Sequence, residues 1–256
     1  MDAGFRTPFL DSFRRGDVAR DIRLLAAQGA LAPRAHEQLG LLMLLVGDQD
    51  PEIARAAEAT LQAIPREPLA AFLARSDAPA EMRAFFAVRG IEPAADAAPE
   101  TDAPIVDTAP EPDPPEPNED AQTTLQRITA MNVAQRVALA MKGSREERAI
   151  LIRDPNKIVA VAVLSSPKMT ESEIESIAKM ASISDEILRI IANTRGWMKR
   201  YGVIVALARN PKTPVAISMN LLARLTEKDL RMLSADRNVP EILRITARQK
   251  VVLEKK

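Results

Sequence analysis

The sequence predicts an all-α protein made of two helical-repeat domains, and three observations lead to this fold class. Residues 152–237 contain one helical unit written twice: Val161–Leu164 matches Val205–Ala208, and Pro167-Lys168 matches Pro211-Lys212, both 44 residues apart. Helix-start patterns are dense, and nine glycines in 256 residues are few for a sheet protein with many tight turns. A self-similar period of this length is typical of an α-solenoid, whose units bury apolar faces against each other.

The composition excludes several kinds of functional site. Hydrophobic residues make up 46% of the chain but aromatic residues only 3%, so the core is expected to be aliphatic. The absence of cysteine excludes disulfides, cysteine-bound zinc and iron–sulfur clusters. One histidine cannot build a typical histidine metal site, so His36 is interpreted as a core or polar-edge residue. We therefore expect no metal and no cofactor.

Residues 1–91 are expected to form a small helical domain. After a lead-in near residues 7–10, helices are expected at about 18–28, 33–46, 52–64, 68–75 and 79–89. The clearest start signal is Asp50-Pro51-Glu52. Asp50 can accept hydrogen bonds from backbone N–H groups, Pro51 has no N–H to leave unpaired, and Glu52 suits the positive end of the helix dipole.

Residues 92–120 have the composition of a disordered acidic, proline-rich linker. They contain 8 of the 19 prolines and 10 acidic residues, with no lysine or arginine. Such a segment cannot bury enough apolar surface to offset the entropy of ordering, and its like charges favour extension. Ile105-Val106 is its only aliphatic pair and would be the natural anchor if the segment docked on a basic face.

Residues 121–256 are expected to form a basic α-solenoid domain with repeats of about 44 residues. Helices are expected at about 121–130, 133–142, 145–153, 156–165, 171–181, 185–193, 197–209, 214–225, 227–235 and 240–253. Reciprocal capping patterns mark several starts, as in Asn132 with Gln135 and Thr170 with Glu173. The segments 158–164 and 203–208 are apolar on nearly every side, which predicts the innermost helices. In the helix after Thr170, the glutamates are expected to face water.

A shorter pattern recurs at the helix ends: an aliphatic run followed by Arg-Asp-Pro or Arg-Asn-Pro. It occurs at Leu151–Pro155 and at Leu207–Pro211, with weaker copies at Leu164–Pro167 and Leu73–Pro79. Residues 50–57 look like the start of a HEAT-type helix. The chain thus resembles bacterial α-solenoids of the HEAT/armadillo-like superfamily, in particular leucine-rich repeat variant proteins. The resemblance implies right-handed stacking of helices and a binding role, without a reaction. The iron–sulfur cluster of the founding leucine-rich repeat variant protein does not transfer, because this chain has no cysteine.

The net charge of zero hides a separation along the chain. Residues 1–120 contain 11 basic and 22 acidic residues, whereas residues 121–256 contain 24 basic and 13 acidic residues. Such an imbalance points to a polyanionic or acidic partner of the basic half, or to contact between the two halves.

The strongest candidate for a binding surface is the segment Arg195–Tyr201. It contains the only tryptophan and the only tyrosine, four residues apart and so expected on one helix face. The candidate site residues here are Arg195, Trp197, Lys199, Arg200 and Tyr201. Tryptophan, tyrosine and arginine dominate binding hot spots, and aromatic residues beside cations also suit stacked bases. The alternative is that Trp197 and Tyr201 pack the seam between two repeats.

A second candidate surface consists of cations that flank the proline turns. Its members are Arg153, Lys157, Lys168, Arg209 and Lys212. They could form a positive stripe along one edge of a solenoid. Cations near helix C-termini are equally well explained as ordinary stabilisers of the helix dipole.

No catalytic constellation is evident, so the expected function is that of a non-enzymatic scaffold or adaptor. Paired acids occur only at exposed helix starts, and no glycine-rich phosphate loop is present. The basic domain is expected to bind an acidic protein surface or peptide. The alternative is RNA or DNA binding, and the acidic linker could inhibit either activity by covering the basic residues. No segment has the signature of a signal peptide or reaches membrane-spanning length, which predicts a cytoplasmic protein.

Overall fold

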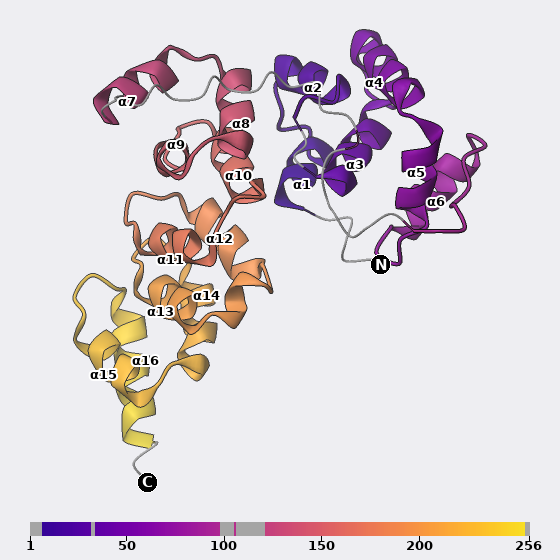
Figure 1. Ribbon diagram of the computed structural model, residues 1–256. Helices are drawn as coiled ribbons and strands as arrows, with labels where there is room; N and C mark the ends of the chain where they lie inside the picture. The colour runs from indigo at the N-terminus through magenta and orange to yellow at the C-terminus, as the bar shows by residue number, and fades with distance from the viewer. Residues whose placement is uncertain (1–6, 32–33, 98–104, 106–120, 254–256) are drawn as a thin grey trace. The chain divides into compact units, whose positions relative to one another are not determined.

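The computed structural model describes residues 7–31, 34–97, 105 and 121–253, and for residues 121–123 and 253 only the backbone. Within these ranges the chain is helical and contains no strand, as expected for an all-α protein (Figure 1). None of the helices described is long and apolar enough to cross a membrane. The expected linker, residues 92–120, lies mostly outside the described residues.

The chain forms two compact units, residues 1–168 and 169–256. Unit 1 contains α1 (Pro8–Arg14), α2 (Arg20–Ala27), α3 (Ala35–Leu45), α4 (Pro51–Ala63), α5 (Arg66–Leu73), α6 (Ala80–Ala87), α7 (Ala121–Ala130), α8 (Val133–Lys142), α9 (Arg145–Leu151) and α10 (Lys157–Ser165). Unit 2 contains α11 (Glu171–Lys179), α12 (Asp185–Asn193), η2 (Trp197–Lys199), α13 (Tyr201–Arg209), α14 (Val215–Leu221), η3 (Leu222–Arg224), α15 (Glu227–Ala235) and α16 (Glu241–Leu253). The expected helices are confirmed to within a few residues except at 197–209, where η2 precedes α13, and at 214–225, where η3 follows α14. The lead-in at residues 7–10 proves to be part of α1.

Local hydrogen bonds explain why the helix starts were predictable. Asp50 caps α4 by accepting from the Glu52 N–H at 2.9 Å, and Pro51 occupies the first turn. Reciprocal capping boxes begin α8, α9 and α11, as the sequence predicts. The box at α11 also buries Glu173, which was expected to face water, because its carboxylate accepts from the Thr170 N–H at 3.0 Å. A capping carboxylate therefore turns inward although its helix face is polar.

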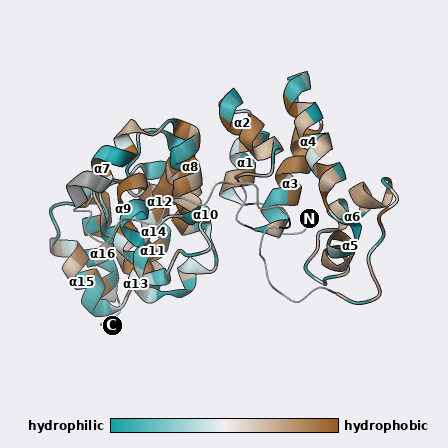
Figure 2. Cartoon of the chain, turned by 45° about the horizontal axis from the view of Figure 1, so that its top comes forward, coloured by the Kyte–Doolittle hydropathy of each residue, from teal (hydrophilic) through white to brown (hydrophobic). Residues whose placement is uncertain are grey.

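The apolar helices lie in the interior of their units. Every residue of α10 from Ile158 to Ser165 is buried, and α13 buries Val203, Ile204 and Ala206–Ala208. α8 packs against α10, and α9 connects them in the sequence. In the same way α11 packs against α13, and α12 and η2 connect them. α3, which also belongs to unit 1, is buried over most of its length, and Figure 2 shows its second half in hydrophobic colours. The aliphatic core predicted from the composition is confirmed.

The structure describes residues 92–97 and residue 105 of the expected linker, and Ile105 is bonded to α3. The N–H of Ile105 donates to the Gln38 side-chain oxygen at 3.0 Å, and the Gln38 amide group donates to the Gly29 carbonyl oxygen at 3.1 Å. Gln38 belongs to α3 and is buried. The backbone of Ile105, a residue suggested above as an anchor for a basic face, is therefore bonded to a helix of the N-terminal region. Val106 lies outside the described residues.

The single histidine behaves as the sequence suggests. The His36 ring packs edge-on against Phe72, with the ring centroids 4.7 Å apart, and its Nε2 lies 3.3 Å from the Asp77 carbonyl oxygen. The prediction of a polar-edge histidine is confirmed by these contacts.

Candidate functional site

The segment Arg195–Tyr201 is a turn between two helices rather than part of one long helix. The 3₁₀ turn η2 covers Trp197–Lys199, and Arg200 then adopts an extended conformation (φ −84°, ψ 119°) before α13 begins at Tyr201. The expected single helix over residues 197–209 is therefore wrong. Because the extended residue interrupts the helical spacing, Trp197 and Tyr201 do not share a face of one continuous helix.

Tyr201 connects the start of α13 to the start of α15. Its hydroxyl donates to the Asp229 carboxylate, at 2.5 Å, and accepts from the Thr226 N–H at 2.9 Å. The Thr226 hydroxyl also donates to the Asp229 carboxylate, at 2.7 Å. The hydrogen bond from Tyr201, followed by that from the Thr226 hydroxyl, holds the pKa of the Asp229 carboxyl below its usual value. The residue as a whole stays 40% exposed. Tyr201 thus has a structural role at the helix start while it remains accessible to solvent.

The cations of this turn divide into paired and unpaired groups. Arg200 forms an ion pair with Glu171 on α11, and this hydrogen-bonded pair raises the pKa of the Arg200 guanidinium above its usual value. Arg195 and Lys199 are exposed, and neither has an ion-pair partner in the part of the chain that the structure describes. They are the two cations of the turn that a partner can reach without breaking an existing pair.

A further arginine reaches the same turn from a distant part of the sequence. Arg224, at the end of η3, donates to the Met198 carbonyl oxygen at 2.6 Å and remains exposed. Trp197 and Met198 are half-buried. We call the set Arg195, Trp197, Lys199 and Arg224 the η2 surface. No sequence pattern marks Arg224, because its contact with Met198 spans 26 residues and follows no local spacing.

The cations that flank the proline turns occur in both units. Arg153, Lys157 and Lys168 belong to unit 1, and all three are exposed. The Lys168 ammonium donates to the Lys142 carbonyl oxygen at the end of α8, at 2.8 Å, which is the contact expected of a cation that stabilises a helix C-terminus. In unit 2, Lys212 is exposed and Arg209 is half-buried at the end of α13.

Arg209 lines a cavity of about 560 Å³ in unit 2. The wall is formed by the ends of α11 and α13 and by the loop after α15, with Lys179, Val205, Asn210 and Asp236 among its residues. The sequence pattern Arg-Asn-Pro marked Arg209 but not Lys179 or Asp236. All three lie at helix C-terminal ends, and that shared position is the signal that could have identified them.

Asn210 holds this wall in place. Its side-chain amide donates to the carbonyl oxygens of Ala178 at 2.7 Å and Met180 at 3.0 Å, and its oxygen accepts from the Lys212 N–H at 2.9 Å. Asn210 is buried, so these bonds fix the end of α11 against the turn that follows α13. The cations Lys179 and Arg209, which line this wall, are suited to binding an anionic group.

Comparison of the chain with protein-family models, with curated proteins and with solved structures gave no match.

Proposed function

We propose that the chain is a non-enzymatic adaptor of two α-solenoid domains whose basic C-terminal region binds an acidic protein surface. The chain would act in the cytoplasm. The observation that carries the proposal is the η2 surface, where the exposed cations Arg195 and Lys199 flank the half-buried Trp197 in the sequence. Tryptophan and arginine are among the residue types most enriched in binding hot spots.

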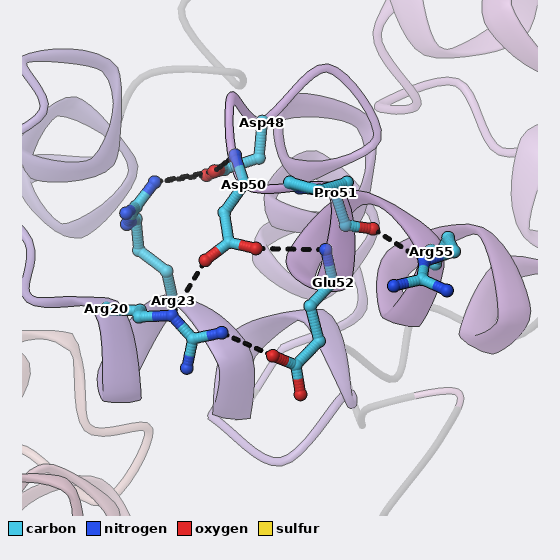
Figure 3. A network of polar contacts seen from close by, with 7 residues as sticks. All are labelled: Arg20, Arg23, Asp48, Asp50, Pro51, Glu52 and Arg55. Carbon is cyan, nitrogen blue, oxygen red and sulfur yellow. Dashed lines mark hydrogen bonds and ion pairs between the residues drawn. The ribbon is translucent and has the colours of Figure 1, made fainter.

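A hydrogen-bonding pattern that occurs twice supports the repeat architecture. Arg23 on α2 donates to Asp48, and Asp48 accepts from the Asp50 N–H at 2.9 Å, just before α4 (Figure 3). Arg136 on α8 donates to Asp154 at 2.6 Å, and Asp154 accepts from the Asn156 N–H at 2.8 Å, just before α10. We call this arrangement the Arg–Asp turn.

The helix that follows each Arg–Asp turn is capped in the same way. Asp50 accepts from the Glu52 N–H at 2.9 Å, and Asn156 accepts from the Ile158 N–H at 3.1 Å. Helices α2, α3 and α4 therefore share their connecting geometry with α8, α9 and α10. Repeated units with equivalent connections are what an α-solenoid requires.

The test compares partner capture by the full chain and by two charge variants. Arg195→Glu with Lys199→Glu reverses the unpaired cations of the η2 surface without touching the Arg200–Glu171 pair. Lys228→Glu with Arg248→Glu makes the same change of net charge at exposed positions on α15 and α16. Each protein is immobilised and exposed to native lysate with and without nuclease treatment. The retained material is washed at low and at high salt and analysed by quantitative mass spectrometry and for nucleic acid.

The adaptor function predicts discrete proteins that the wild-type chain and the control variant retain and the η2 variant loses. Equal retention by all three proteins, with unchanged circular dichroism, would rule out the η2 surface. If retention instead disappears with nuclease treatment and falls steeply with salt, the chain binds nucleic acid, since release of counterions makes such binding strongly dependent on salt.

A further inference from the structure

The cavity of unit 2 has the dimensions of a ligand site. Its volume of about 560 Å³ lies within the range of roughly 300–1,000 Å³ that is typical of such sites. Apolar atoms of Ala181, Val205, Ala206 and Pro211 form part of the wall, and two cationic side chains, two amide side chains and the carboxylate of Asp236 form the rest. A mixed wall of this kind suits a ligand with one charged group on a short aliphatic stem.

Arg209 is a polar side chain of this wall whose hydrogen-bond donors are unused. It is half-buried, and within the described ranges it has no hydrogen-bond or ion-pair partner. A guanidinium group carries five N–H donors in a planar fork, which matches the two oxygens of a carboxylate. The neighbouring Asn210 amide is fully used, because it donates to two carbonyl oxygens and accepts one N–H.

The helix ends around the cavity explain the position of Arg209 but leave its donors available. Helices α11, α13 and α15 all end at this wall, and helix C-termini favour nearby cations. The carbonyl oxygens of Ala178 and Met180 are nevertheless bonded by Asn210, and those of Ala206 and Leu207 accept the Asn210 N–H. Arg209 thus lines the cavity without a hydrogen bond to these ends, and its positive charge also helps to lower the pKa of the Asp229 carboxyl at the start of α15.

The other charged groups of the wall limit which anion fits. Lys179 pairs with Glu175 at 2.6 Å on the exposed side of α11, and exposed pairs of this kind are weak enough to exchange partners. Asp236 is held by the Asn238 N–H, which donates to its carboxylate at 3.0 Å. Because Asp236 adds a negative charge to the wall, a singly charged anion is favoured over a doubly charged phosphate.

We propose that this cavity binds the carboxylate side chain of an acidic segment in the partner protein. Arg209 donates two hydrogen bonds to the carboxylate, Lys179 adds a second positive charge, and Val205 and Pro211 contact the aliphatic stem. The inference rests on the proposed adaptor function, since it names the chemical group of the partner that the basic region recognises.

The test is a titration of the ¹⁵N-labelled full chain followed by NMR. The probes are an acetylated and amidated hexapeptide with one central glutamate, the same peptide with glutamine, and glutarate as a free dicarboxylate. The glutamate peptide should shift the backbone amides of residues 205–210 and 236–238, and the glutamine peptide should not. Arg209→Gln should weaken binding of the glutamate peptide about tenfold or more, because hydrogen bonds to a charged group are among the strongest in proteins.

Lys228→Gln is the matched control, since it removes an exposed cation of α15 that is not among the residues lining the cavity. It should bind the glutamate peptide as the wild type does, and Lys179→Gln should show an intermediate loss. Circular dichroism and the urea midpoint of each variant check that the fold is intact. Equal binding of both peptides, equal binding by Arg209→Gln, or no shift of the cavity amides at about 10 mM peptide would overturn the proposal. Tighter binding of glutarate than of the peptide would overturn the assignment to a protein segment.

These outcomes are separate from those of the capture experiment. If Arg209→Gln and the wild type retain the same partners and the titration fails, the cavity assignment is wrong and the adaptor function stands. If the titration succeeds while no protein is captured, the cavity binds carboxylates and the adaptor function is wrong.

Discussion

At the scale of single residues, the Tyr201 hydroxyl carries more of the structure than its exposure suggests. It donates to Asp229 and accepts from the Thr226 N–H, so it takes part in the capping of α15. The pKa of Asp229 is lowered in the folded state, first by the Tyr201 hydrogen bond and then by that of Thr226. A carboxyl with a lowered folded pKa stabilises the protein above its unfolded pKa, and this contribution is lost as the pH falls through the folded value.

Tyr201→Phe should therefore destabilise unit 2 at pH 7 by about 0.5–1.5 kcal/mol, the usual contribution of a hydrogen bond. The difference from wild type should shrink below about pH 4, where Asp229 becomes protonated in the unfolded and then in the folded state. Urea denaturation at pH 7 and pH 3 measures both effects. An additive result in the double variant with Asp229→Asn would show that the two side chains do not interact.

Sequence patterns predicted the roles of side chains that bond to residues a few positions away in the sequence. They failed for side chains whose partners are far away in the sequence. The capping role of Thr170 follows from Glu173 three residues later, and the structure confirms it. Burial of Glu173 was not anticipated, because the polar face of a helix normally points to water. The Tyr201–Asp229 bond spans 28 residues, and no period of the sequence relates its two members.

At the scale of elements, the ion pairs of this protein differ in how far they are exposed to solvent. In the Arg–Asp turn before α10, the Asp154 side chain is 5% exposed and that of Arg136 is 21% exposed. The pair of Arg189 and Asp185 on α12 is instead 54% and 64% exposed. Loss of a buried partner leaves a charge without compensation, whereas water replaces an exposed partner at little cost.

Arg136→Met should accordingly cost about 3 kcal/mol of unfolding free energy, and Arg189→Met at most about 0.5 kcal/mol. Arg23→Met should resemble Arg136→Met, because Asp48 is 7% exposed and occupies the equivalent turn. Urea denaturation of the three variants gives the comparison. A small effect of Arg136→Met together with a large effect of Arg23→Met would contradict the equivalence of the two turns.

The helix bounds were predictable because they depend on caps and prolines that act within a few residues. The Arg–Asp turns were not, since Arg23 and Asp48 are 25 residues apart and Arg136 and Asp154 are 18 apart. The break at Arg200 was missed for a related reason. The apolar pattern of α13 continues smoothly into Trp197, and only the extended conformation of Arg200 separates them.

At the scale of the whole molecule, the charge separation along the chain raises the question of whether the acidic segment competes with a partner for the basic residues of 121–256. Residues 106–120 contain six acidic residues and no basic one. Ile105, which precedes this segment, donates its backbone N–H to Gln38 of α3, and this hydrogen bond involves no charged group. The composition of residues 106–120 thus predicts that they compete with an acidic partner for the cations of residues 121–256.

If residues 106–120 inhibit partner binding, replacing their acids by asparagine and glutamine at unchanged length should increase the amount of partner that the full chain retains. The increase should be largest at low salt and nearly absent at about 1 M salt, where the screening length falls to about 3 Å. A shuffled segment of the same composition is the control, since it keeps the charge and should keep the inhibition. Quantitative capture at both salt concentrations measures the effect. Retention that is unchanged by neutralisation, or released equally by shuffling, would show that the acidic segment acts as a spacer and does not mask the basic surface.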